Sequence, residues 1–244
     1  MLGSIIHSRV WRWTAVGKHP VAADYIQLES GSSLLNALSD WMTKGYDQIN
    51  RSGDPRQGPY SWRFWLRGVQ KGGLICGLGR DSSDRIGRPF PLLIMGEGLL
   101  KGWEKTWGLL PVMLAKTWGR MEFIASHRYD DTQELASELK SMIVEDAIAA
   151  VSPQTASMFS AALPADAMAA CTEQLRQTGR AIVNLSNLGG LDPTQAAIQW
   201  HQALKACCAD IPRGVFLGGT TQATYLVVLQ QPLNTSDFVK LWTL

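Results

Sequence analysis

The sequence contains few of the residue patterns that carry common enzymatic chemistry. Its four cysteines, Cys76, Cys171, Cys207 and Cys208, include no Cys-x-x-Cys pair, so neither a zinc site nor a disulfide framework is expected. The four histidines show no His-x-x-x-His spacing and offer no helical platform for a metal. No glycine pair is completed to Gly-x-Gly-x-x-Gly or to a Walker loop. The sequence therefore predicts no catalytic, cofactor-binding or metal-binding residue and no cofactor.

An excess of charge of one sign and long apolar runs are also lacking. The 23 basic and 21 acidic residues leave a net charge of +2, without a basic cluster, which argues against a nucleic-acid partner and a membrane-surface protein. No apolar run approaches the length of a membrane span. The apolar segment at the N-terminus is too short and too often interrupted by other residues for a signal peptide. We therefore expect a cytoplasmic protein without membrane insertion. The pattern indicates no particular oligomeric state.

What is present is a regular succession of strand and helix patterns. Alternating or continuous apolar runs predict strands at 9–17, 60–66, 74–78, 92–95, 180–185, 215–217 and 225–229. Helical spacing and caps predict helices at 32–49, 111–124, 131–147, 164–179, 192–208 and 236–242. So many helices cannot lie on one face of a sheet, which favours a three-layer α/β/α sandwich.

Hairpins at 62–78 and 215–229 predict that the central sheet is mixed rather than all-parallel. The chain shows no internal repeat, no low-complexity stretch and no clear linker. We expect one domain over residues 1–244, and the best candidate for a subdivision lies near residues 126–131.

The densest polar stretch lies between two apolar strands, at residues 80–91. It carries two Asp, two Ser, three Arg, one Gly and two Pro. Asp and Ser bond to nearby backbone in tight turns, Gly87 permits positive φ, and the prolines force an extended exit. A rigid charged loop held by core strands is a common carrier of function.

Two interpretations of this loop remain open from the residues alone. Asp81 and Asp84 could hold Mg²⁺, although pairing with the neighbouring arginines is favoured because a hard cation usually recruits more oxygen ligands. Arg85 and Arg88 could clamp an anion, or one of them could fasten the loop. We expect Arg88 to be anchored on Asp84 and Arg85 to remain available.

These residues carry a resemblance to a known family. The series Gly17-Lys-x-Pro20, Asp24-Tyr25 and Asp40-Trp41, followed by Trp62-Arg-Phe64 and Ser83-Asp-Arg-Ile-Gly-Arg-Pro-Phe-Pro-Leu92, resembles the TagF/ImpM family of type VI secretion-associated proteins. The matches run in order from Gly17 to Leu92. Ala23 stands where the family has Gly, and Tyr25 where it has Phe, so details of the loop after Lys18 differ.

The resemblance implies a cytoplasmic accessory protein of the type VI secretion system in a Gram-negative bacterium. It implies post-translational repression through a forkhead-associated scaffold protein, an α/β sandwich and no catalytic residue. The alternative is an anionic-ligand receptor or an enzyme that uses a Lys/Asp/Arg cluster. The candidate functional residues under either hypothesis are Lys18, Asp24, Ser83, Asp84, Arg85 and Arg88.

Overall fold

The computed structural model describes residues 11–29, 31–53, 58–144, 163–186 and 192–244. Its centre is an eight-stranded sheet with the order β2-β1-β5-β4-β3-β7-β8-β6. The strands are β1 (Arg12–Gly17), β2 (Ile26–Leu28), β3 (Ser61–Arg67), β4 (Gly73–Arg80), β5 (Leu92–Leu99), β6 (Arg180–Asn184), β7 (Gly214–Gly219) and β8 (Thr224–Leu229).

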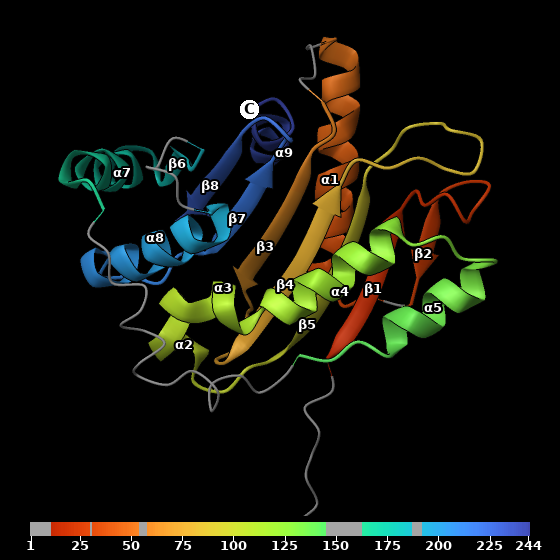
Figure 1. Cartoon of the computed structure of the whole chain (residues 1–244), viewed down its shortest axis with the longest axis horizontal. Helices are drawn as coiled ribbons and strands as arrows, with labels where there is room; N and C mark the ends of the chain where they lie inside the picture. Colours follow the sequence, from red (N-terminus) through yellow and green to blue (C-terminus); the bar gives the residue numbers. More distant parts are fainter. Residues whose placement is uncertain (1–10, 30, 54–57, 145–162, 187–191) are drawn as a thin grey trace, which may run out of the picture.

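Helices lie on both faces of this sheet, so the predicted α/β class and layered arrangement are confirmed (Figure 1). One face is covered by α1 (Ser33–Ser52) and α9 (Thr235–Leu241). The helical elements on the other face are α2 (Trp103–Thr106), the 3-10 turn η1 (Trp107–Leu109), α3 (Leu110–Met113), α4 (Ala115–Ser126), α5 (Thr132–Lys140), α7 (Ala165–Thr178) and α8 (Pro193–Cys207).

The predicted mixed sheet is wrong, because every pair of neighbouring strands is antiparallel. Parallel neighbours require a crossover that returns to the adjacent strand. Here the helical connections join strands that are not neighbours: β5 leads to the far edge strand β6, and β8 lies between β6 and β7. The two predicted hairpins, β3–β4 and β7–β8, are both present.

The helix α1 follows directly from its sequence pattern. Ser32 caps it, with its hydroxyl accepting a hydrogen bond from the Leu35 amide, as serine does at helix starts. Its buried stripe includes Trp41 and Gly45, and the glycine allows the ring of Phe238 in α9 to lie against the helix backbone. Packing against α9 therefore requires a residue without a side chain at position 45.

Three other expectations differ from the structure. The three-residue strand β2 was not predicted. The predicted helix 111–124 is divided between α3 and α4 at Leu114, and α2 and η1 precede it. The predicted helix 131–147 begins as expected at its Asp131 cap but ends at Lys140, so Met142 and Ile143 lie beyond it; Ala147 lies outside the described residues.

No helix in the described parts of the chain combines the length and apolar character needed to cross a membrane.

Candidate functional site

The buried carboxylate of Asp84 organises the charged loop. Its Oδ1 accepts hydrogen bonds from the amides of Ile86 at 3.1 Å and Arg88 at 2.9 Å. Its carbonyl oxygen accepts one from the Gly87 amide at 2.9 Å, and Gly87 has φ +86°. Asp84 thus folds residues 84–88 into a closed turn, which glycine permits because it readily adopts positive φ.

The second oxygen of Asp84 joins the two loops at this end of the sheet. Its Oδ2 lies 2.9 Å from Nζ of Lys18 and 2.6 Å from Nε of Arg88. The Arg88 guanidinium continues to the carbonyl oxygen of Ala23 at 2.8 Å and to Oδ2 of Asp24 at 3.3 Å. We call Lys18, Asp24, Asp84 and Arg88 the Asp84 cluster.

The backbone also brings the two loops together. The amide of Arg85 donates to the carbonyl of Ala22 at 2.8 Å, and that of Lys18 to Pro91 at 3.3 Å. Gly17 has φ +115°, and a Cβ there would overlap the carbonyl oxygen of Pro91. A side chain at position 17 would therefore force the loops apart.

Charge is balanced inside the Asp84 cluster. Burial by itself would raise the pKa of Asp84, but hydrogen bonds from the Lys18 ammonium and from Arg88 outweigh it and hold the pKa below its usual range. Asp84 is therefore a poor general base. Lys18 is only 13% exposed and already faces a carboxylate, so little of its charge is left for a bound anion.

The structure brings four of the six predicted residues into one cluster and leaves two outside it. Arg88 is anchored on Asp84 as expected, and its side chain is half exposed. Arg85 is exposed and makes no ion pair with a described residue. Ser83 pairs through its backbone with Pro89.

Asp81 has a structural role that the sequence did not reveal. Its Oδ2 accepts the amide of Tyr60, and its Oδ1 accepts the indole N–H of Trp242, both at 2.9 Å. Because the two oxygens of Asp81 and those of Asp84 are directed to different partners, the two residues do not form a common cation site. Among the described residues, no group of three metal-ligating side chains is found.

Apolar side chains surround the tip of the loop. Ile86 is 70% exposed at the turn that Asp84 closes. Tyr25 is also exposed, and its ring stands edge-on to Phe90, with centroids 5.6 Å apart. The loop therefore presents Arg85 and Ile86 to solvent on a backbone held by its own hydrogen bonds.

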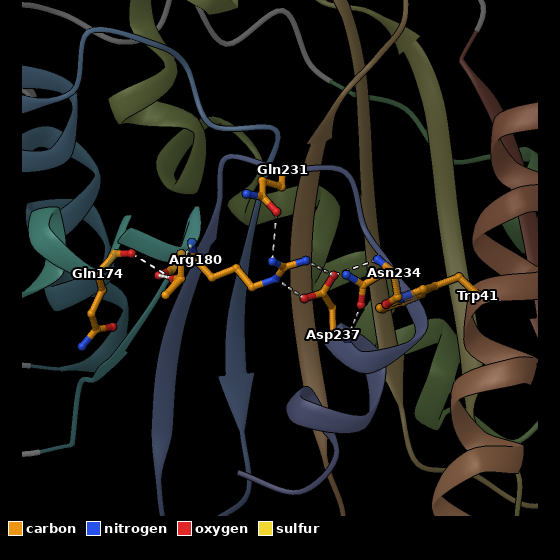
Figure 2. A network of polar contacts seen from close by, with 7 residues as sticks. Trp41, Gln174, Arg180, Gln231, Asn234 and Asp237 are labelled. Atoms are coloured by element: carbon orange, nitrogen blue, oxygen red, sulfur yellow. Dashed lines mark hydrogen bonds and ion pairs between the residues drawn. The ribbon is translucent and has the colours of Figure 1, made fainter. Parts of the chain in front are cut away.

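A second polar network joins the edge strand β6 to α9 and α1 (Figure 2). Arg180, on the edge strand β6, reaches α9 with Nε 2.5 Å from Oδ1 of Asp237 and also bonds Gln231. Asp237 forms a capping box with Asn234, whose carbonyl accepts the indole N–H of Trp41 at 2.7 Å. This network ties the sheet edge to α9 and α1, and its groups are satisfied by one another.

The model of the TagF N-terminal domain, described as type VI secretion system-associated, matches residues 14–143, more than half of the chain. The chain belongs to the TagF family. The matched part contains the whole Asp84 cluster and the strands β2 to β5 with most of β1.

A solved structure supports the fold of this TagF-family chain. PA0076 from Pseudomonas aeruginosa PAO1 aligns with a TM-score of 0.50 and 16% identity, over 95% of this chain and 94% of that one. At this identity the likeness concerns the fold alone. No curated protein matches the chain.

Proposed function

We propose that this TagF-family chain is a cytoplasmic accessory protein that represses type VI secretion post-translationally by binding a forkhead-associated scaffold protein. Its contact face is the turn at residues 84–88, and it acts by binding rather than by catalysis. The family assignment supports the secretion role, and the resemblance noted in the sequence motivates the choice of partner.

The observation that carries this proposal is that some charged residues of the loop hold its structure while others are exposed to solvent. The charges of Lys18, Asp24, Asp84 and Arg88 balance one another. Arg85 and Ile86 instead face solvent, and Arg85 has no ion-pair partner among the described residues. Rigid, exposed arginine and apolar side chains are typical of interface contacts, because little conformational entropy is lost when they bind. The alternative of an anion-binding enzyme is less well supported, because Lys18 and Arg88, two of the three cations it would use, are already paired with carboxylates.

The functional unit in this proposal is the whole chain, as one domain over residues 1–244. A single continuous sheet supports this, since β7 pairs with β3 and joins the C-terminal strands to the N-terminal ones. The packing of α9 against α1 supports it further.

The test separates the contact residues from the anchor. Arg85→Ala and Ile86→Asp should keep the urea midpoint of the wild type and lose capture of the scaffold protein and repression of secretion, because both side chains are exposed. Arg88→Ala should lower the midpoint, since Asp84 loses a partner. Arg12→Ala, an exposed arginine at the far end of β1, is the matched control. If Arg85→Ala and Ile86→Asp both capture the scaffold and repress secretion normally, the turn is not the contact face.

A further inference from the structure

A basic hollow lies at the end of β4 opposite the charged loop. It has a volume of about 620 Å³ and is formed by the β3–β4 turn and the connection from β5 to α2. Four cations line it, Arg67, Lys71, Lys101 and Lys105, against a single carboxylate, Glu104. Glu104 accepts a hydrogen bond from the Gly72 amide at 2.6 Å, so it braces the turn.

The four cations of this hollow have no carboxylate within ion-pair distance among the described residues. In contrast, Lys18, Arg63, Arg88 and Arg180 each face a carboxylate. Four cations held around a single carboxylate produce a positive potential that favours an anionic partner. The net charge of the chain is only +2, so this potential is local.

An apolar groove adjoins the basic hollow. Its volume is about 480 Å³, and it lies between the first turns of α1, the end of β3 and the connection from β8 to α9. Its apolar lining includes Leu34, Leu38, Trp41, Leu66, Leu229 and Leu233. Arg67 and Val69 line both hollows, and Val69 is 92% exposed on the turn between them.

We propose that the basic hollow and the apolar groove together form a docking site for an acidic peptide segment of a protein partner. Acidic side chains of the segment face Lys71, Lys101 and Lys105, and an adjacent apolar side chain enters the groove beside Val69. Each volume lies within the range of ligand pockets, roughly 300–1,000 Å³. A small inorganic anion would fill only the basic hollow, and a flat membrane surface does not fit two concave sites.

This inference goes beyond the proposed function. The strand β4 runs eight residues from Gly73, beside the basic hollow, to Arg80, at the charged loop. At about 3.4 Å per residue the two ends are well separated. A partner segment on the hollows therefore leaves Arg85 and Ile86 free for a second contact.

The experiment selects peptides without assuming a partner. A displayed library of random twelve-residue peptides is selected on the immobilised full chain, and the enriched peptides are synthesised with fluorescein and measured by anisotropy. We expect net negative sequences with a large apolar residue, whose affinity falls as NaCl rises because charge pairing is screened. The triple variant Lys71→Glu/Lys101→Glu/Lys105→Glu should bind them at least tenfold more weakly. Ala37→Glu, which places a negative charge in the apolar groove, should weaken binding of the peptides as well.

A matched control carries the same change in net charge elsewhere. Lys44→Glu/Arg128→Glu/Lys240→Glu alters three exposed cations that line neither hollow, and it should bind the peptides as the wild type does. Urea midpoints confirm that each variant is folded. The proposal is overturned if no acidic peptides are enriched, or if both triple variants bind them equally. Binding to phosphatidylglycerol vesicles that exceeds binding to the enriched peptides would assign the cations to a membrane instead and also overturn it.

Discussion

The indole Nε1 of Trp65 in β3 donates a hydrogen bond to Nε2 of His201 in α8 at 3.1 Å. The other ring nitrogen of His201, Nδ1, lies 2.7 Å from the carbonyl oxygen of Ala197, so it carries the proton and the ring is neutral. Burial lowers the pKa of His201 to about 4. The histidine is thus a core residue that joins the sheet to the helical layer.

This geometry predicts that stability falls as pH is lowered from about 6.5 to 4. In that window the unfolded chain binds a proton at His201 and the folded chain does not, so the free energy of unfolding falls by about 1.4 kcal/mol per pH unit from this residue. Asp84 does not contribute there: its lowered pKa supplies stability that is lost only below the ordinary carboxyl pKa. Buried His19, whose pKa is also lowered by burial, adds in the same direction.

The measurement is urea unfolding at several pH values. His201→Gln should flatten the slope between pH 4.5 and 6.5, whereas His127→Gln, at an exposed position, should leave it unchanged. Equal slopes in the two variants would contradict the assignment of the titration to His201.

Two glycine substitutions should change stability in opposite directions. A Cβ on Gly45 would lie 2.5 Å from the Cβ of Phe238, whereas one on Gly119 in α4 meets nothing within 4 Å. Alanine favours a helix by about 1 kcal/mol over glycine, so Gly119→Ala should stabilise by that amount. Gly45→Ala should instead destabilise by about 1–3 kcal/mol, because overpacking outweighs propensity. Thermal melting of both variants decides this, and a higher melting temperature for Gly45→Ala would show that α9 can move away.

Trp41 should contribute both buried area and a hydrogen bond. Its ring is 8% exposed, and its N–H donates to the carbonyl of Asn234. Trp41→Ala should lower the free energy of unfolding by about 3–5 kcal/mol. Trp41→Phe keeps most of the contact and leaves the carbonyl without its donor, so its cost should be nearer about 1 kcal/mol. Similar urea midpoints for the two variants would mean that the ring contributes little.

The ion pair between Arg180 and Asp237 should also be important for stability. Asp237 is 8% exposed and Arg180 is 29% exposed at the side chain. Arg180→Ala leaves the carboxylate of Asp237 without its counter-charge. The free energy of unfolding should fall by about 2–3 kcal/mol, less than on truncation of a fully buried pair. Arg176→Ala, which breaks the exposed pair with Glu173, is the control and should leave the urea midpoint unchanged. The same midpoint for both variants would show that the Arg180–Asp237 pair adds no more stability than an exposed pair.

Much of the loop geometry could be predicted because its contacts are local. Asp84 and Arg88 are four residues apart, and the turn between them needs only Gly87 and the backbone amides. The resemblance made Lys18 a candidate residue, but its ion pair with Asp84 was not predicted. The partner Trp242 of Asp81 could not be predicted, because it is 161 residues away in the sequence. A single Asp in a polar loop does not indicate which distant indole N–H will donate a hydrogen bond to it.

The errors in the fold have the same origin. Strand positions follow from local alternation, but strand order does not: the pairing of β1 with β5 and of β3 with β7 leaves no local pattern. The break at Leu114 could not be predicted either, since the apolar pattern continues through it. The burial of His201 could not be predicted from local sequence, because its bonding partner, Trp65, lies in another layer.

The strand order has a consequence for synthesis of the chain. The first five strands form a contiguous block in the sheet, β2-β1-β5-β4-β3. The ribosome synthesises all five before β7, so this block can form while β7 is still missing. Until then β3 is an open edge, rich in tryptophan and phenylalanine, and such edges template aggregation. The nascent protein is therefore most vulnerable between the emergence of β5 and that of β7, an interval of more than 100 residues. At about 5–20 residues per second, this interval lasts several seconds or longer, and a chaperone that shields β3 would have that long to act.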